Sequence, residues 1–317
     1  MIRFTAIRLL EIAALAALLS FVVYALIGLM PGDPIDLMRQ ADPRVSAADV
    51  ARLKAAYGLD QPLVDRYLAW AAQALSGDLG YSRLFAAPVW SALLPRLGNS
   101  LVLMGSSFLL ALALALPLGI AAARRPGSRL DMAINLSCFA GVSMPTFWLA
   151  LLLILLFAAG LGWLPASGIG TVGASGIGDR LSHLVLPVMT LSLANLGGYT
   201  RYVRAGMREA LAQDHIRTAR AKGAGEMRVI LHHALRSAMI PVTTILALSF
   251  GGLVSGALVT ETMFAYPGMG KLIFDAVMGN DYNLALAALL LAAVTTMLAN
   301  LAADLAYGWL DPRVSYR

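Results

Sequence analysis

The sequence contains little charge, one cysteine and few histidines. Only 13% of its 317 residues are charged, whereas a soluble domain averages about 25%. The single cysteine, Cys138, lies inside an apolar run, which excludes an internal disulfide and a cysteine-based metal cluster. His232 and His233 are adjacent and would point to different sides of a helix, unlike the i, i+4 histidine pair of a zinc site. The sequence therefore predicts no metal site.

Motifs for covalent chemistry, nucleotide binding and nucleic-acid binding are also missing. Without a P-loop, any process driven by ATP would need an ATPase on another chain. There is no G-x-S-x-G nucleophile elbow, and no histidine in an apolar run pairs with Ser143, which makes an intramembrane hydrolase a weak alternative. No basic stretch is interleaved with aromatic residues, as a nucleic-acid site would require. We predict no catalytic residue and no cofactor bound by this chain.

What the sequence does contain is long apolar runs. Its residues are 59% hydrophobic and its mean hydropathy is +0.74. The first run, Ile12 to Met30, is too long for the 7 to 15 residues of a signal-peptide core, and at 1.5 Å per residue it extends about 28 Å, close to the thickness of the hydrocarbon core. Six runs predict an all-α integral membrane protein with six spans: Ile12 to Met30, Leu101 to Ala123, Met132 to Ala159, Leu184 to Tyr199, Met239 to Thr260 and Leu284 to Ala303.

Lysine and arginine in the connections predict the orientation, because cytoplasmic loops carry an excess of them. The second and fourth connections are rich in basic residues, whereas the third and fifth contain only Arg180 and Lys271. Both termini should then be cytoplasmic. The predicted organisation is residues 1–30 with the first span, an extracytoplasmic helical segment 31–96, a transmembrane domain 97–310 with a cytoplasmic loop 201–238, and a cytoplasmic tail 311–317.

The sequence of the extracytoplasmic segment, residues 31–96, predicts two short amphipathic helices. The first begins near Ser46, with Asp49 three residues later, and ends at Gly58. The second begins at Pro62 and places Leu63 and Trp70 on one face. Packing of these helices on the spans and docking of a partner both remain open.

The fourth connection is long, basic and patterned. Asp214 fits a helix N-cap, His215 to Lys222 make two helical turns, and Gly223 fits the helix stop. A second surface helix should follow, burying an apolar stripe made of Met227, Ile230, Leu231, Ala234, Leu235 and Ala238.

This connection resembles a known family. Gln213 to Gly223, followed by His233 to Arg236 and Ile240-Pro241, is similar to the cytoplasmic "EAA" loop of ABC-importer permeases, specifically their dipeptide, oligopeptide and nickel branch. Arg217 and Thr218 stand where the general pattern has Glu and Ala, and Arg236 replaces its proline. These departures are typical of the peptide-type branch. Further segments that resemble the branch cover the chain: Pro31 to Pro34, Gly58 to Leu63, Gly77 to Gly80, Glu261 to Gly270 and Asp311 to Arg313.

The resemblance implies the type I permease fold of a first permease subunit, which forms half of a translocation pathway in a bacterial or archaeal cytoplasmic membrane. It implies as partners a second homologous permease, two ATPases that carry ATP and Mg, an extracytoplasmic substrate-binding protein and the lipid bilayer. By resemblance an outer gate includes Glu261, Phe264, Pro267 and Gly268. The implied ATPase-coupling helix consists of Asp214, His215, Ile216, Arg217, Thr218, Ala219, Arg220, Ala221, Lys222 and Gly223.

Other functional classes predict other features. A secondary transporter should carry paired ionisable residues within its spans, but Glu11, Glu261 and Asp304 all lie near predicted span ends. A membrane scaffold or receptor would not need the patterned helix before Gly223. The substrate stays open among peptides, nickel complexes, glutathione-like molecules and oligosaccharides, as do the residues that contact it and whether the two ATPases are identical.

Overall fold

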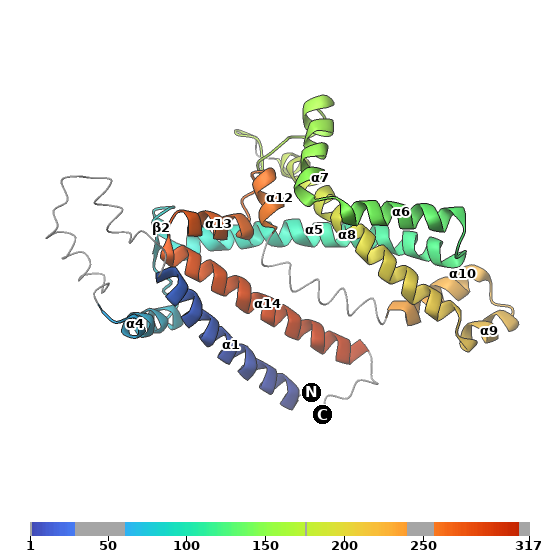
Figure 1. Cartoon of the computed structure of the whole chain (residues 1–317), viewed down its shortest axis with the longest axis horizontal. Helices are drawn as coiled ribbons and strands as arrows, with labels where there is room; N and C mark the ends of the chain where they lie inside the picture. Colours follow the sequence, from blue (N-terminus) through green and yellow to red (C-terminus); the bar gives the residue numbers. More distant parts are fainter. Residues whose placement is uncertain (1, 29–60, 175, 240–256, 311–317) are drawn as a thin grey trace.

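A computed structural model describes residues 2–28, 61–174, 176–239 and 257–310, and these are almost entirely helical (Figure 1). The only sheet in these ranges is a two-stranded hairpin, in which Tyr81 pairs with Pro88. The elements are α1 (Ile2–Gly28), α4 (Leu63–Leu75), β1 (Tyr81–Ser82), β2 (Ala87–Pro88), α5 (Val89–Arg124), α6 (Arg129–Ser143), α7 (Thr146–Leu153), η1 (Ile154–Gly160), α8 (Ile177–Leu211), α9 (Asp214–Ala221), α10 (Glu226–Arg228), η2 (Val229–Ala234), α12 (Leu258–Met263), α13 (Met269–Met278) and α14 (Tyr282–Leu310).

Four of the described helices are long and apolar enough to cross a membrane. They correspond to the spans predicted as first, second, fourth and sixth: Phe4–Gly28, Val89–Arg124, Ile177–Leu211 and Tyr282–Ala302. The last two residues of the first predicted span, Leu29 and Met30, lie outside the described residues. The helices α5 and α8 extend beyond the predicted runs. At 36 residues, α5 is about 54 Å long, well over the roughly 30 Å hydrocarbon core, so part of it projects from the membrane.

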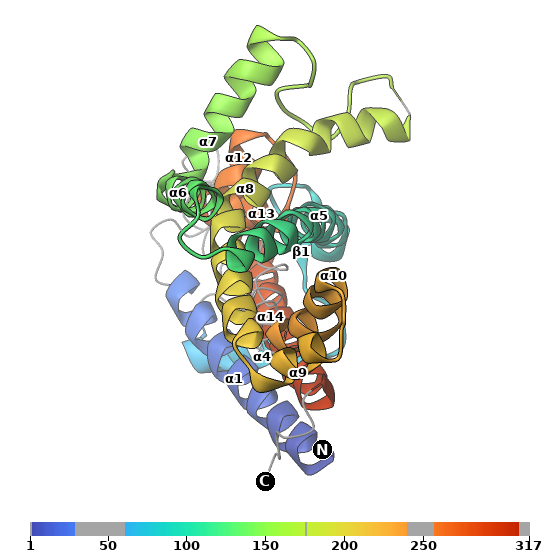
Figure 2. The ribbon, with the colours of Figure 1, turned by 90° about the vertical axis from the view of Figure 1, so that its right-hand side faces the viewer.

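The third predicted span is not one straight helix. The helices α6 and α7 with η1 meet at an angle of 102° around Met144 and Pro145, and the segment of α7 and η1 points away from the direction of α6 (Figure 2). Ala150 and Leu153 of α7 pack with Leu186 of α8 and with Phe264. Met144 is extended, with φ −80° and ψ 127°, because the ring of a following proline disfavours the α region. The continuous span Met132 to Ala159 was therefore wrong, and the pair is a broken span or a re-entrant loop. Counted as one crossing, it makes five in the described ranges.

The remaining predictions for the fold concern one further span and the two outer helices. The first outer helix, Ser46 to Gly58, lies outside the described residues. Most of the fifth span, Met239 to Thr260, also lies outside them, because only residues 239 and 257–260 of it are described. The helix predicted to begin at Pro62 is confirmed as α4, with Pro62 as its N-cap, whereas its position on the outer side stays a prediction.

Close packing explains one glycine in α8 and one in α5. A Cβ on Gly197 would collide with the backbone carbonyl of Cys138 in α6, and a Cβ on Gly119 in α5 would lie 2.6 Å from Val203 in α8. Small residues at these crossings let three helices approach closely. The bundle of α5, α6 and α8 thus forms the packed centre from which the loop after α8 projects.

Candidate functional site

The helix α9 forms as the sequence predicts, with a shift at its first residue. Gln213, not Asp214, occupies the N-cap position, with φ −75° and ψ 152°, and its side chain caps no backbone N–H. Asp214 lies in the first turn, where its negative charge interacts favourably with the positive end of the helix dipole. Its Oδ1 is 3.5 Å from Arg217 Nη1. The expectation that Asp214 is the N-cap was therefore wrong by one position.

The end of α9 is confirmed at Gly223. Its φ of +79° lies in the left-handed region, which only glycine adopts without strain. The N–H of Ala224 donates to the carbonyl of Ala219 at 3.1 Å, and the N–H of Gly223 donates to the carbonyl of Arg220 at 2.9 Å. This is the Schellman pattern that satisfies the last carbonyls of a helix.

The two faces of α9 have different surroundings. Ile216 is fully buried and Ala219 is partly buried, and both pack in one apolar cluster with Val229 of η2 and Met207 of α8. The opposite face is exposed, and it is predominantly basic and polar. Its residues are His215, Arg217, Thr218, Arg220, Ala221 and Lys222. Packing within this chain thus accounts for a small residue at position 219. Ala221 is exposed, so its small size leaves room for a partner protein to approach.

An ion pair that sequence reasoning missed closes the turn after α9. Arg220 donates from Nη2 to Glu226 Oε1 at 2.8 Å and from Nε to Oε2 at 3.2 Å. This pairing lowers the pKa of Glu226 and raises that of Arg220. The pair ties α9 to α10 across the glycine turn.

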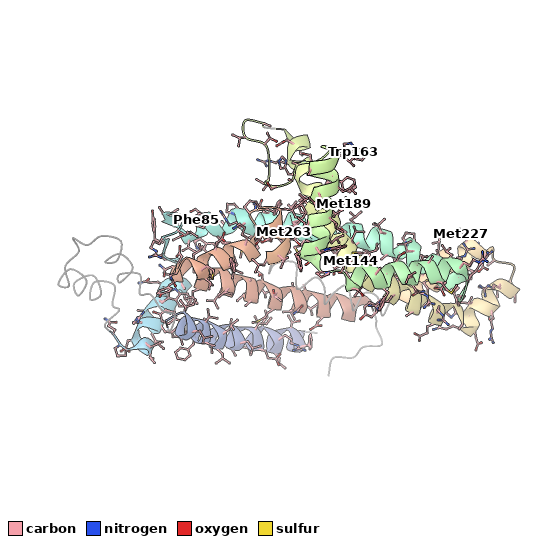
Figure 3. All side chains as sticks on the ribbon, turned by 45° about the horizontal axis from the view of Figure 1, so that its top comes forward. Phe85, Met144, Trp163, Met189, Met227 and Met263 are labelled. Carbon is pink, nitrogen blue, oxygen red and sulfur yellow. The ribbon has the colours of Figure 1, made fainter. Side chains whose placement is uncertain are left out.

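The helix that follows α9 buries a different face from the predicted one. Ile230, Ala234 and Ala238 are buried as expected, but Met227 is 61% exposed, and it lies on the surface in Figure 3. Residues Val229–Ala234 form a π-helical turn, which advances fewer degrees per residue than an α-helix. Consequently Val229 turns inward while Leu231 turns outward.

The second candidate site surrounds a carboxylate. Glu261 of α12 is 0% exposed, which contradicts a simple solvated residue at a span end. Its oxygens accept hydrogen bonds from Ser100 Oγ at 2.7 Å, from the N–H of Lys271 at 2.8 Å and from the N–H of Ala257 at 3.2 Å. Three donors satisfy a buried carboxylate, and two of them join α12 to the first third of α5 and to the first turn of α13.

The turn after α12 is held by the same region of α5. Asn99 donates from Nδ2 to the carbonyl of Pro267 at 2.8 Å, and the backbone carbonyl of Asn99 accepts a hydrogen bond from the Tyr266 hydroxyl at 3.2 Å. Phe264 is 1% exposed, and its carbonyl accepts from the N–H of Gly168 at 2.8 Å. The structure therefore brings Glu261, Phe264, Pro267 and Gly268 together in one structured turn, in which Pro267 is partly buried and the other three are buried.

Position 268 requires glycine because the side chains of Ser100 and Glu261 occupy the space that a Cβ would fill. A Cβ there would lie 2.6 Å from Ser100 Oγ and closer still to Glu261 Oε1. Its φ of −107° is ordinary, so the constraint is space and not backbone conformation.

A further ion pair joins α6 to α8. Arg204 donates from Nε to Asp131 Oδ1 at 2.6 Å and from Nη2 to Oδ2 at 2.8 Å, while Asn135 and the N–H of Gly127 donate to the same carboxylate. From the sequence, Arg204 is one of the basic residues of the fourth connection, which predict only the orientation of the chain in the membrane. No local signal could reveal the pair, because its two residues are separated by 73 positions.

The helix α5 links the two candidate sites. Ser100 in its first third donates a hydrogen bond to Glu261, and Ala123 near its end packs in the cluster that holds Ile216. The separation of 23 residues corresponds to about 35 Å along a helix, close to the roughly 30 Å hydrocarbon core. Figure 3 shows Met263, which lies in α12 with Glu261, toward the middle of the molecule, and Met227, which follows α9, near its right-hand end.

Comparison with known proteins identifies the family. Residues 115–316 match the family described as "Binding-protein-dependent transport system inner membrane component". The chain belongs to this family. It is 40% identical over 301 residues to the oligopeptide transport system permease protein AppB of Bacillus subtilis (strain 168), covering 94% of each chain.

Other members of the family align over similar lengths. The dipeptide transport system permease protein DppB of Escherichia coli (strain K12) is 35% identical over 321 residues, with 94% of each chain covered. The di/tripeptide transport system permease protein DppB of Pseudomonas aeruginosa (strain UCBPP-PA14) is 37% identical over 320 residues, again with 94% of each chain covered. As an inner membrane component of a binding-protein-dependent system, this chain is a multi-pass transport subunit, and the predicted resemblance to permeases is confirmed.

Proposed function

We propose that this chain is the permease subunit of an ATP-binding cassette importer for dipeptides or oligopeptides, and that it forms half of the translocation pathway. The observation that carries the proposal is the similarity, over 94% of the chain, to permeases named for oligopeptide, dipeptide and di/tripeptide transport. A family defined by dependence on a binding protein also fits a subunit that does not select the substrate by itself.

The proposed partners are a second homologous permease, two ATPases with ATP and Mg, and an extracytoplasmic binding protein. The exposed face of α9 supports the ATPase partner, because Arg217 and Lys222 are exposed and can make charge-assisted contacts around the small Ala221. Ile216 fixes the other face to α8 and η2, so a force applied to α9 would reach the long helices. We take α9 as the coupling helix.

The proposed topology has six spans, both termini in the cytoplasm, α9 on the inner side and α4, α13 and the loop 161–174 on the outer side. The basic connections and the length of α5 support it. Glu261, Phe264, Pro267 and Gly268 would then form a rigid outer gate element, whose buried hydrogen bonds join α12, α13 and α5.

Labelling from either side of the membrane tests this topology. On a Cys138→Ala background, Val172→Cys and Lys222→Cys should react with a membrane-impermeant maleimide from opposite sides, since both positions are exposed. In sealed right-side-out vesicles only Val172→Cys should react, and permeabilisation should expose Lys222→Cys. Reaction of both positions from the same side would contradict the proposed topology.

Uptake by the reconstituted importer tests the proposed function. Vesicles that contain this chain, its partner permease and both ATPases should take up a labelled dipeptide or oligopeptide only with internal ATP and external binding protein. Uptake driven by an ion gradient without ATP would point to a secondary transporter. Uptake of a nickel complex without peptide would overturn the substrate class.

A further inference from the structure

The short helix α4 has three faces with different surroundings. One face, with Tyr67 and Trp70, packs on α1, and a second carries Asp65 and Gln73. The third face is apolar and exposed within the described part of the chain. It consists of Val64, Leu68, Ala72 and Leu75, which follow one another at i, i+4, i+8 and i+11, and Leu75 is 90% exposed.

The contacts of α4 place it beside the outer half of α1, whose end it crosses in Figure 1. The rings of Phe21 and Tyr67 meet edge to face with centroids 5.2 Å apart, and Tyr24 and Trp70 lie 5.9 Å apart. The Tyr67 hydroxyl is 2.8 Å from Ser20 Oγ and 3.3 Å from the carbonyl of Ala17.

These contacts lie at hydrocarbon depth along α1. The exposed ion pair between Arg8 and Glu11 is the last charged group before the apolar run. Ser20 is nine residues beyond Glu11, or roughly 14 Å along the helix, and Gly28 is roughly 26 Å beyond it. Both values fall inside a core about 30 Å thick, so α4 cannot pack on this part of α1 from bulk water.

The helix α1 has an exposed apolar stripe of its own, away from this contact. Leu15, Leu18, Val22 and Leu26 form it at i, i+3, i+7 and i+11 on a membrane span, as expected of a lipid-facing surface. Each helix of the packed pair therefore carries an exposed apolar stripe. Tyr67, Ser20 and the Ala17 carbonyl bond one another, as polar groups at membrane depth must.

We propose that α4 is embedded in the outer leaflet, with Val64, Leu68, Ala72 and Leu75 against lipid acyl chains and Asp65 at the headgroups. The helix is then a membrane anchor that braces the first span, and not a water-exposed cap on the outer mouth. The assignment to the outer leaflet rests on the topology proposed above, whereas the contact with lipid does not.

Spin labels test the contact in the complete importer in phosphatidylcholine and phosphatidylglycerol vesicles. Labels at Leu68→Cys and Leu75→Cys, on a Cys138→Ala background, should collide several-fold more with oxygen, relative to a water-soluble nickel chelate, than a label at Val172→Cys. Leu26→Cys supplies the lipid reference, because it is exposed on α1 itself.

Each outcome decides the proposal. Values at Leu68 and Leu75 close to those at Leu26 support it. Strong collision with the nickel chelate would show that the stripe faces water, and protection from both reagents would show that protein covers it; either result overturns the proposal. If the spin labels report lipid and the maleimide test shows the opposite topology, the lipid contact stands and α4 lies in the inner leaflet.

Discussion

Replacing Gly268 by alanine should destabilise the chain strongly, although it adds only one methyl group. The new Cβ would enter the space between Ser100 Oγ and the Glu261 carboxylate, neither of which is at the flexible end of a free side chain. Overpacking of this kind costs about 1–3 kcal/mol, and loss of a hydrogen bond to the buried carboxylate adds about 1.5–3 kcal/mol. We expect a clear fall in membrane abundance and in the unfolding temperature of the purified complex.

Gly105→Ala is the matched control, since Gly105 lies inside α5 with open space at its Cβ position. Alanine there should be neutral or slightly stabilising, because glycine is the weaker helix former by about 0.5–1 kcal/mol. If both variants accumulated and unfolded like the parent, Glu261 and Ser100 would not form the tight network that joins α5, α12 and α13.

Replacing Ala221 by tryptophan should uncouple transport from ATP hydrolysis without unfolding the chain. Ala221 is exposed on α9, so the added ring meets no atom of this chain's core, whereas it would obstruct close approach of the ATPase. A poorly packed interface loses about 1–3 kcal/mol, which corresponds to about tenfold or more in assembly. We expect that loss in ATPase co-purification and in substrate-stimulated ATP hydrolysis, with unchanged membrane abundance.

Ala69→Trp provides the control for added bulk, because Ala69 is exposed on α4 far from α9. It should leave ATP hydrolysis unchanged. Two other substitutions on α9 are less informative: Ala219 packs in the chain's own apolar cluster, and Gly223 has a positive φ that strains any other residue. Arg217→Ala should have the smaller effect, since it removes charge from an exposed position without adding bulk. Normal coupling in Ala221→Trp would exclude α9 as the ATPase contact.

Local sequence signals predicted the local features of the structure. Gly223 ends α9 because a left-handed residue is needed there, and Pro62 begins α4 because its fixed φ suits the first turn. Long apolar runs predicted the four long helices, since an apolar segment in lipid has no water to bind and must satisfy its backbone hydrogen bonds within a helix. In the loop after α8, the beginning and end of α9 were therefore predicted to within one residue.

Features that depend on contacts between distant segments were not accessible. Glu261 has the sequence context of a solvated span end, and only Ser100 and Lys271, brought beside it by the fold, make it a buried acceptor. The 102° bend at Pro145 follows a signal that the sequence does contain, but the apolar run on both sides conceals it. The π-helical turn Val229–Ala234 has no composition signal, and it rotated the predicted apolar stripe.

The most direct test of the account is a cross-link from α9 to its ATPase. On a Cys138→Ala background, Ala221→Cys carrying a short photoactivatable cross-linker should capture an ATP-binding cassette ATPase in intact membranes, and Ala69→Cys should not. Capture at Ala221 alone would show that α9 lies against the ATPase, as a coupling helix must. Failure to capture an ATPase at Ala221, in membranes where the importer is assembled and active, would contradict that claim.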